Sequence, residues 1–249
     1  QPSNPITPQP SSNEEITKKY HIRVDNSPHF NTMLNLYIKL YEGSKTYRNI
    51  IQEIETRKKQ PITILDRKTA IEKYTAEGKL QYAEDTRNFQ FPACWDDKLN
   101  AVIIMEPASL NPSELGTLIA FETTNGFQQE KFQKVTSNAC AGHYRDQVTG
   151  LKEEEMIERA AKQYALVNEK IEQEGLGLQK SIISEAIQSN TITEEWAKRW
   201  STKQLNCGEV WRLSCLSEYG QNHIGYYANY YKTTIAPNLK KESKNITKN

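Results

Sequence analysis

Hydrophobic residues in the first part of the chain recur three or four positions apart, which is the spacing of one face of an α-helix. The first such stripe covers residues 30–41 and stops at Gly43. The second begins after Ser44, a good helix-capping residue, and ends in the basic stretch 57–60. The stripes consist of Phe30, Met33, Leu34, Tyr37, Ile38 and Tyr41, and of Tyr47, Ile50, Ile51 and Ile54. We therefore predict two consecutive helices.

Short β-branched or alternating hydrophobic runs predict three strands, at residues 20–24, 61–65 and 99–105. Pro107 stops the third strand, which has the most regular pattern. Residues 66–98 are polar, so we expect irregular structure there, with a short helix near 69–76 and an aromatic patch at 89–95.

Residues 111–126 carry helix signals at both ends. Asn111 is a good N-cap, Pro112 suits the first helical position, and Glu114 completes a capping box. We expect Gly126 to adopt the left-handed conformation that stops the helix.

The second half of the chain is expected to be helical. A polar segment reaches Gly150, and a long helix covers 151–174 and ends at Gly175. Further helices are predicted at 178–189, 193–204, 208–218 and 221–233. The fold class is therefore α+β, mostly helical with a small mixed sheet. We predict a disordered leader (1–17), an α+β domain (18–175), a helical region packed on it (176–235) and a basic disordered tail (236–249).

Composition excludes some classes of partner. The chain has 249 residues and a formal net charge of +1, so no overall field favours nucleic acid. No hydrophobic run has the length of a membrane span. There is no hydrophobic signal segment, and a start at Gln1 leaves room for an upstream segment that has been removed. The four cysteines are free thiols, or a Cys207–Cys215 or Cys94–Cys140 bridge forms if the protein works outside a reducing cytosol.

The helix at 111–126 also carries the most unusual residue of the chain. Leu115, Leu118 and Ile119 form one face, and Glu122 falls in the middle of it. A carboxylate on an apolar face must be paired, hydrogen-bonded or used in function. Glu122 is either a structural carboxylate, with Arg145 or Arg159 as partner, or an acid/base or ligand-binding group.

The sequence around Glu122 has the register of the zinc-peptidase motif H-E-x-x-H. Phe121 and Asn125 stand at the two histidine positions. Phenylalanine cannot bind a metal and asparagine is a poor zinc ligand, so we expect no zinc on this helix and no cofactor. Asn125 is either a helix-end residue that bonds local carbonyls or an amide donor beside Glu122.

Three other groups are candidates. Glu155 and Glu158 either lie in a solvated helix start or face Glu122 as a second carboxylate. Cys140 and His143 could form half a zinc site or a nucleophile–base pair, or simply occupy a turn. The tyrosine run at 226–231, with Tyr227 and Tyr230, is either core or a face that binds a protein partner.

The order of predicted elements over residues 20–175 resembles the zincin-like metallopeptidase domains of secreted bacterial effectors and toxins. The resemblance implies that the strand at 99–105 lies along a substrate cleft and that Glu122 matches the general base. It places Phe121 and Asn125 at ligand positions they cannot fill, and Glu155 or Glu158 where a downstream carboxylate lies. It also implies delivery outside the producing cell.

These observations support three hypotheses. The first is an effector- or toxin-type domain without zinc ligands, which binds a protein target or uses Glu122 in a metal-independent reaction. The second is a peptidase-like hydrolase with a site rebuilt from Glu122, Glu155 or Glu158, and His143, with or without a metal. The third is an enzyme that uses Cys140 as its nucleophile.

Overall fold

The computed structural model describes residues 12–148, 150–192 and 222–239. The described part is mostly helical with one small mixed sheet, which confirms the predicted α+β class. The strands are β1 (Thr63–Asp66), β2 (Ala93–Asp96) and β3 (Ala101–Ile104). The helices are α1 (Asn13–Tyr20), α2 (Phe30–Gly43), α3 (Lys45–Lys58), α4 (Arg67–Ala76), α5 (Leu80–Asn88), α6 (Pro112–Phe127), α7 (Gln129–Val148), α8 (Glu153–Gln188) and α11 (Asn222–Tyr230).

Strand β3 lies in the middle of the sheet. It is parallel to β1 and antiparallel to β2, so β2 is an edge strand. Side chains of β3 alternate between two hydrophobic layers, as the pleat requires. Val102 and Ile104 pack into the main core with α2, α3 and α6, whereas Ala101 and Ile103 pack into a smaller core with α4.

Helix α6 is the central element of the main core. It begins as the sequence predicts, because Asn111 and Glu114 exchange the two hydrogen bonds of a capping box and Pro112 lies in the first turn. Most of its 16 residues are buried, because α2, α3, α8 and the sheet surround it. Even the polar Thr123 and Thr124 are fully buried, and their hydroxyls donate to carbonyls of the preceding turn.

The end of α6 differs from the prediction. Gly126 is not left-handed, and the helix continues to Phe127. A Cβ atom at Gly126 would lie 2.5 Å from the indole ring of Trp95 in β2, so glycine is needed for close packing. The guanidinium of Arg57 donates to the carbonyls of Gly126 and Phe127 at 2.5 and 3.1 Å, which satisfies the end of the helix.

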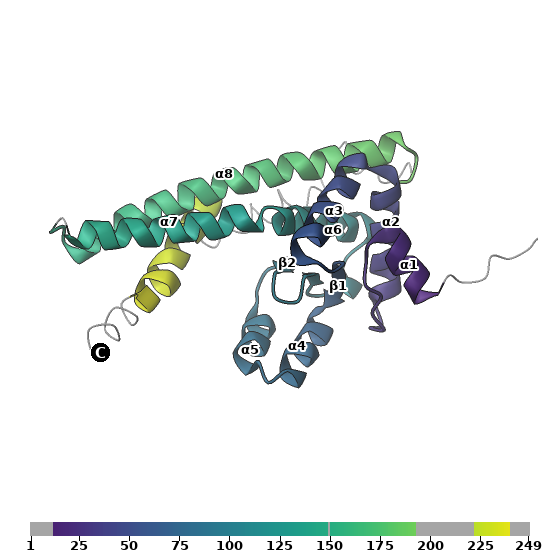
Figure 1. The fold of residues 1–249 in the computed structure, drawn as a ribbon, viewed down its shortest axis with the longest axis horizontal. Coiled ribbons are helices and arrows are strands. Elements are labelled where there is room, and N and C mark those ends of the chain that lie inside the picture. The colour runs from purple at the N-terminus through teal and green to yellow at the C-terminus, as the bar shows by residue number, and fades with distance from the viewer. Residues whose placement is uncertain (1–11, 149, 193–221, 240–249) are drawn as a thin grey trace, which may run out of the picture.

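Helices α7 and α8 lie side by side and extend from the body as a long arm, with α11 against α8 (Figure 1). A second, smaller core holds the arm together. Its buried members are Val135, Ala139, Ala160, Ala161, Tyr164, Ile171, Tyr231 and Ala236.

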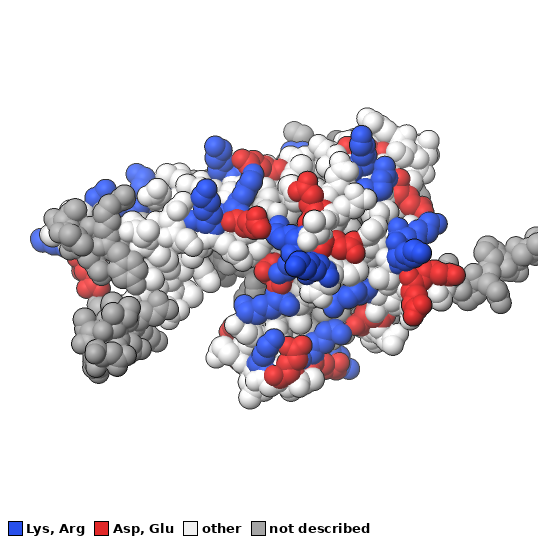
Figure 2. Space-filling model, in the orientation of Figure 1, with Lys and Arg blue, Asp and Glu red and all other residues white. Residues whose placement is uncertain are grey.

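The surface shown in Figure 2 carries basic and acidic side chains side by side, without a large patch of one sign. In the part of the chain that the structure describes, no helix combines the length and the apolar character needed to cross a bilayer.

The N-terminal predictions were partly wrong. Ser12 and Glu15 form a capping box, so α1 occupies part of the predicted leader and the start of the predicted strand at 20–24. Only Ile22 of that strand pairs, in an isolated bridge with Ile62. Residues 1–11 lie outside the described residues.

Two segments expected to be irregular are regular. The short helix near 69–76 is present as α4, but α5 and β2 follow it within the stretch 66–98. The polar segment before Gly150 is the helix α7. Its few apolar residues, Phe132, Val135 and Ala139, have helical spacing and pack against α8, so tertiary contact outweighs the polar composition.

Gly175 does not end the long helix. Helix α8 continues to Gln188 and includes the helix predicted at 178–189. A Cβ atom at Gly175 would lie 2.9 Å from the Gln128 side chain and 3.2 Å from that of Thr124, so this glycine lets α8 approach α6 closely. Helical backbone continues from α11 through the π-helical turn Tyr231–Ile235 to residue 239, past the predicted start of the tail at 236. The helices predicted at 193–204 and 208–218 lie outside the described residues.

Candidate functional site

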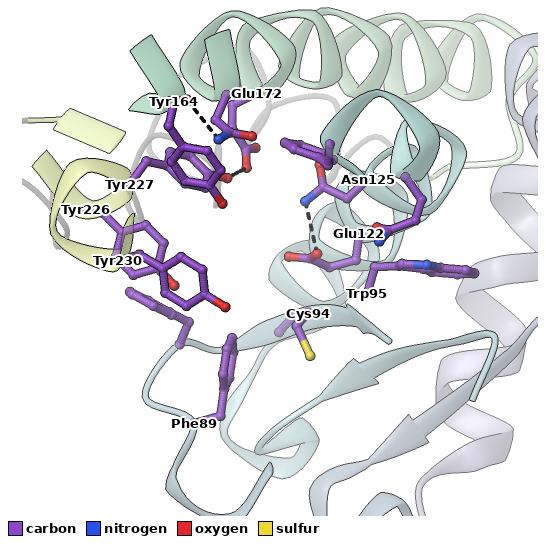
Figure 3. Close-up of a pocket in the computed structure, with 15 residues that line it drawn as sticks. Phe89, Cys94, Trp95, Glu122, Asn125, Tyr164, Glu172, Tyr226, Tyr227 and Tyr230 are labelled. Atoms are coloured by element: carbon purple, nitrogen blue, oxygen red, sulfur yellow. Dashed lines mark hydrogen bonds between the residues drawn. The ribbon is translucent and has the colours of Figure 1, made fainter. Parts of the chain in front are cut away.

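A cavity of about 430 Å³ opens where the arm meets the body (Figure 3). Its walls come from the segment before β2, from β2 itself, and from α6, α7, α8 and α11. The lining residues are Phe89, Phe91, Ala93, Cys94, Trp95, Glu122, Asn125, Gln129, Phe132, Tyr164, Asn168, Glu172, Tyr226, Tyr227 and Tyr230. We call this cavity the junction pocket.

Glu122 projects from α6 into the junction pocket, and only 7% of it is exposed. Its carboxyl accepts hydrogen bonds from the Asn125 side-chain amide, at 3.2 Å, and from the backbone N–H of Trp95. Burial, and then the charge of Glu172, raise the pKa of Glu122 to about 8 despite these two bonds. At neutral pH, Glu122 is therefore mostly a neutral acid.

Glu172 is the second carboxyl of the junction pocket, and it comes from α8. It is 3% exposed and accepts a hydrogen bond from the hydroxyl of Tyr227 on α11. Burial and the charge of Glu172 raise the pKa of Tyr227 well above its ordinary value, so Tyr227 keeps its proton. This hydrogen bond ties the short helix α11 to the arm at the pocket wall.

Aromatic rings form most of the remaining wall, which we call the aromatic wall: Phe89, Phe91, Phe132, Tyr164, Tyr226, Tyr227 and Tyr230. They contact one another across separate elements. The Phe91 and Tyr226 ring centroids are 5.3 Å apart, which joins the segment before β2 to α11. Tyr226 stacks on Tyr230 at 6.4 Å. The pocket is thus built from parts of the chain that only the tertiary fold brings together.

No Lys, Arg or His is among the described residues that line the junction pocket. Cys94 lies there as a free thiol, and burial together with the charge of Glu122 raises its pKa, which makes it a poor nucleophile. Among the described residues, no group of three or more His, Cys, Asp or Glu is arranged to hold a metal ion. The described lining residues therefore provide two carboxyls, side-chain amides and the faces of aromatic rings for contact with a ligand.

Four of the predicted site residues lie together in this pocket, namely Glu122, Asn125, Tyr227 and Tyr230. Phe121 does not line it. Phe121 is 2% exposed and faces Gly175 of α8, so it is part of the packing between α6 and α8.

Glu155 and Glu158 are exposed near the start of α8 and do not face Glu122. Glu158 pairs with Lys232 instead. The helix places both carboxylates about four to five turns before Glu172, so the structure contradicts the predicted pairing with Glu122.

Arg159 is exposed and lines a separate cavity between α7 and α8, so it is not the partner of Glu122. The side chains of Arg145 and His143 lie outside the described residues. No disulfide joins Cys94 to Cys140, so the first of the two possible bridges is absent, and the other pair of cysteines lies outside the described residues.

Glu172 was not predicted from the sequence as a site residue, although its spacing on α8 carries a signal. Tyr164, Asn168 and Glu172 recur every four residues on the inward face of α8, and Gln179 continues that face after Gly175. Polar residues repeated on a buried face are as unusual as Glu122 on α6. Tyr164, Asn168 and Glu172 all fall within the helix predicted at 151–174, and only Gln179 lies beyond its expected end at Gly175.

The strand that lines the pocket also differs from the expectation. The edge strand β2 lies beside Glu122, whereas the predicted cleft strand at 99–105 is the central strand β3. No protein-family model matches the chain, and neither a curated protein nor a solved structure matches it.

Proposed function

We propose that this chain is a target-binding domain of the effector or toxin type, which holds a group of its protein target in the junction pocket. The observation that supports this most directly is the pocket itself. It combines buried carboxyls with a ring-lined wall and opens at the junction of six chain segments. Concave, mostly apolar sites with a few placed polar groups are typical of ligand binding.

The exposure of the rings supports binding over a purely structural role. Tyr230 is 40% exposed although its ring stacks on Tyr226 at the pocket wall. Tyrosine offers a large, rigid contact area with a polar end, and it is common at binding hot spots.

The proposal predicts that loss of the pocket rings abolishes target binding. A displayed library of random peptides is selected on the wild-type protein, and the affinity of enriched peptides is measured by fluorescence polarisation. The double variant Tyr226→Ala/Tyr230→Ala should bind these peptides at least tenfold more weakly. Tyr82→Ala, which removes an exposed ring on α5 outside the pocket, should bind them as the wild type does. Equal affinity for all three proteins would contradict a binding role for the pocket.

A hydrolase is the second candidate, and one observation favours it. The carboxyl of Glu122, whose pKa is raised to about 8, lines the same pocket as the carboxyl of Glu172, and paired carboxyls can divide the acid and base roles between them. Glu122→Gln distinguishes the two functions. If the pocket is catalytic, the wild type cleaves the selected peptides, whereas Glu122→Gln binds them without cleaving them. If the pocket only binds, neither protein cleaves the peptides.

A further inference from the structure

A second cavity, of about 480 Å³, lies near the N-terminal ends of the parallel strands β1 and β3 and shares no lining residue with the junction pocket. Its walls come from residues 23–25, from Gln60 and β1, from the end of α4 and from residues 98–99. We call it the strand-end pocket. We propose that it binds a small organic monocarboxylate, whose charged group lies against Arg23 and Lys98 and whose carbon chain lies against the apolar walls.

Arg23 is a half-buried cation with one side of its guanidinium still free. Its Nε donates to the carbonyl of Pro61 at 3.1 Å, and its Nη2 donates to the carbonyl of Leu99 at 2.8 Å. Burial lowers the pKa of Arg23, although the charge of Asp25 raises it, so the guanidinium is desolvated more than it is compensated. The Nη1 group and the second N–H of Nη2 have no hydrogen-bond partner among the described residues. Two such parallel N–H groups match the two oxygens of a carboxylate.

Lys98 brings a second cation to the same cavity. Its ammonium lies 4.3 Å from the centre of the Tyr82 ring and pairs with no carboxylate in the part of the chain that the structure describes. Lys98 directly precedes Leu99, whose carbonyl holds the guanidinium of Arg23. The backbone at this point therefore fixes both cations at one wall of the pocket.

The acidic side chains of the strand-end pocket already have partners. Asp25 accepts a hydrogen bond from the backbone N–H of Ser27 at 2.9 Å and pairs with Lys73 at 3.1 Å. Glu77 pairs with Lys79 at 2.7 Å. The two other cations of the wall are thus the groups that a ligand can neutralise, and this favours an anion. The two acids would repel a dianion more strongly than a monoanion, so a carboxylate is favoured over a phosphate.

The rest of the wall suits a carbon chain. Val24, Leu65, Ala76 and Leu99 line the cavity, and Leu65 is fully buried. A bare anion would leave these side chains without contact, whereas an organic acid covers them and gains from their removal from water. The combination of an apolar wall with a few placed polar groups is typical of a site for a small molecule.

Titration of the isotope-labelled protein with sodium isovalerate, followed by the NMR shifts of its backbone amides, tests the proposal. Saturable shifts should appear at Thr63 and Leu99 but not at Trp95 of the junction pocket. Lys98→Gln, at an exposed position, should bind at least threefold more weakly. Lys68→Gln is the matched control, because it removes the same charge from an exposed position of α4 outside the cavity, and it should bind as the wild type does.

Two further comparisons separate charge from shape. Arg23→Lys keeps a positive charge but loses the forked donors, so it should bind isovalerate at least tenfold more weakly. If Arg23→Lys does not fold, which its amide spectrum shows, Lys98→Gln decides the test. Isobutyl methyl ketone has nearly the shape of isovalerate without its charge, and it should cause no saturable shift at Thr63 or Leu99.

The proposal is wrong if isovalerate causes no saturable shift in the wild type at millimolar concentration, or if the ketone binds equally well. It is also wrong if Lys98→Gln binds isovalerate unchanged, or if inorganic phosphate binds at least tenfold more tightly than isovalerate. None of these results bears on the proposed function, because the two pockets share no lining residue. Tyr226→Ala/Tyr230→Ala should accordingly bind isovalerate as the wild type does.

Discussion

At the scale of single residues, Glu122 is the most informative position of the chain. Its place on the face formed by Leu115, Leu118 and Ile119 follows from helical spacing alone, and the sequence was sufficient to predict that it is unusual. The structure adds that it is buried and protonated at neutral pH. Its neighbours Asn125 and Glu172 show the limit of sequence reasoning. Asn125 follows Glu122 by three residues on the same helix, so helical spacing places it beside Glu122, whereas only the tertiary fold brings Glu172 to the same pocket.

The raised pKa of Glu122 predicts how stability depends on pH. The folded state keeps the proton up to about pH 8, whereas the unfolded chain releases it near pH 4.5, so Glu122 makes the fold less stable as pH rises between these values. Glu122→Gln removes this effect. We expect similar free energies of unfolding for both proteins at pH 5 and a variant more stable by on the order of 3 kcal/mol at pH 9. Urea denaturation at both pH values measures this.

Glu174→Gln serves as the control for this pH series, because Glu174 lies on the same arm but is exposed. If the difference in free energy of unfolding between the wild type and Glu122→Gln is the same at pH 5 and at pH 9, Glu122 is ionised throughout this range and the prediction is wrong.

At the scale of elements, local signals located the start of α6 but not the ends of α6 and α8. Asn111, Pro112 and Glu114 act through contacts within one turn, so the sequence predicts them well. Gly126 and Gly175 were expected to end helices, yet both lie inside a helix where another element approaches closely. A glycine needed for packing looks the same in a sequence as a glycine needed for a left-handed turn, and only the neighbouring element distinguishes them.

This role of Gly126 predicts a penalty for the smallest possible side chain. In Gly126→Ala the new methyl group would overlap the ring of Trp95, so α6 and β2 must move apart. We expect a loss of about 1–3 kcal/mol in the free energy of unfolding, measured by urea denaturation. Gly177→Ala is the matched control, because a methyl group at that position of α8 would have no neighbouring atom within 4 Å among the described residues. It should stabilise the protein by up to about 1 kcal/mol through helix propensity. Equal effects at both positions would refute the packing role.

At the scale of the whole molecule, the chain has one large core in the body and a smaller one in the arm. Composition and periodicity were sufficient to predict the α+β class and most helices of the body. In the arm, helices were predicted where α8 and α11 lie, but α7 was not predicted, because it is polar and its helical state depends on contact with α8. The junction pocket lies where these two units meet, and therefore no local sequence pattern reveals it.

The difference between the two cores predicts a difference in local stability. The arm core consists largely of alanine and tyrosine, whereas the body core contains many fully buried isoleucine and leucine side chains. We expect backbone amides of α7 to exchange with deuterium at least tenfold faster than those of α6, measured by mass spectrometry of peptides after exchange. Equal protection of the two helices would mean that the arm and the body unfold as one cooperative unit.

Helix α8 is shared by both units. Its 36 residues span about 54 Å, and its inner half is clamped against α6 at Gly175 while its outer half carries α7. The position of Glu172 in the pocket therefore depends on the contacts of α8 with α6 in the body as well as on its contacts with α7 in the arm.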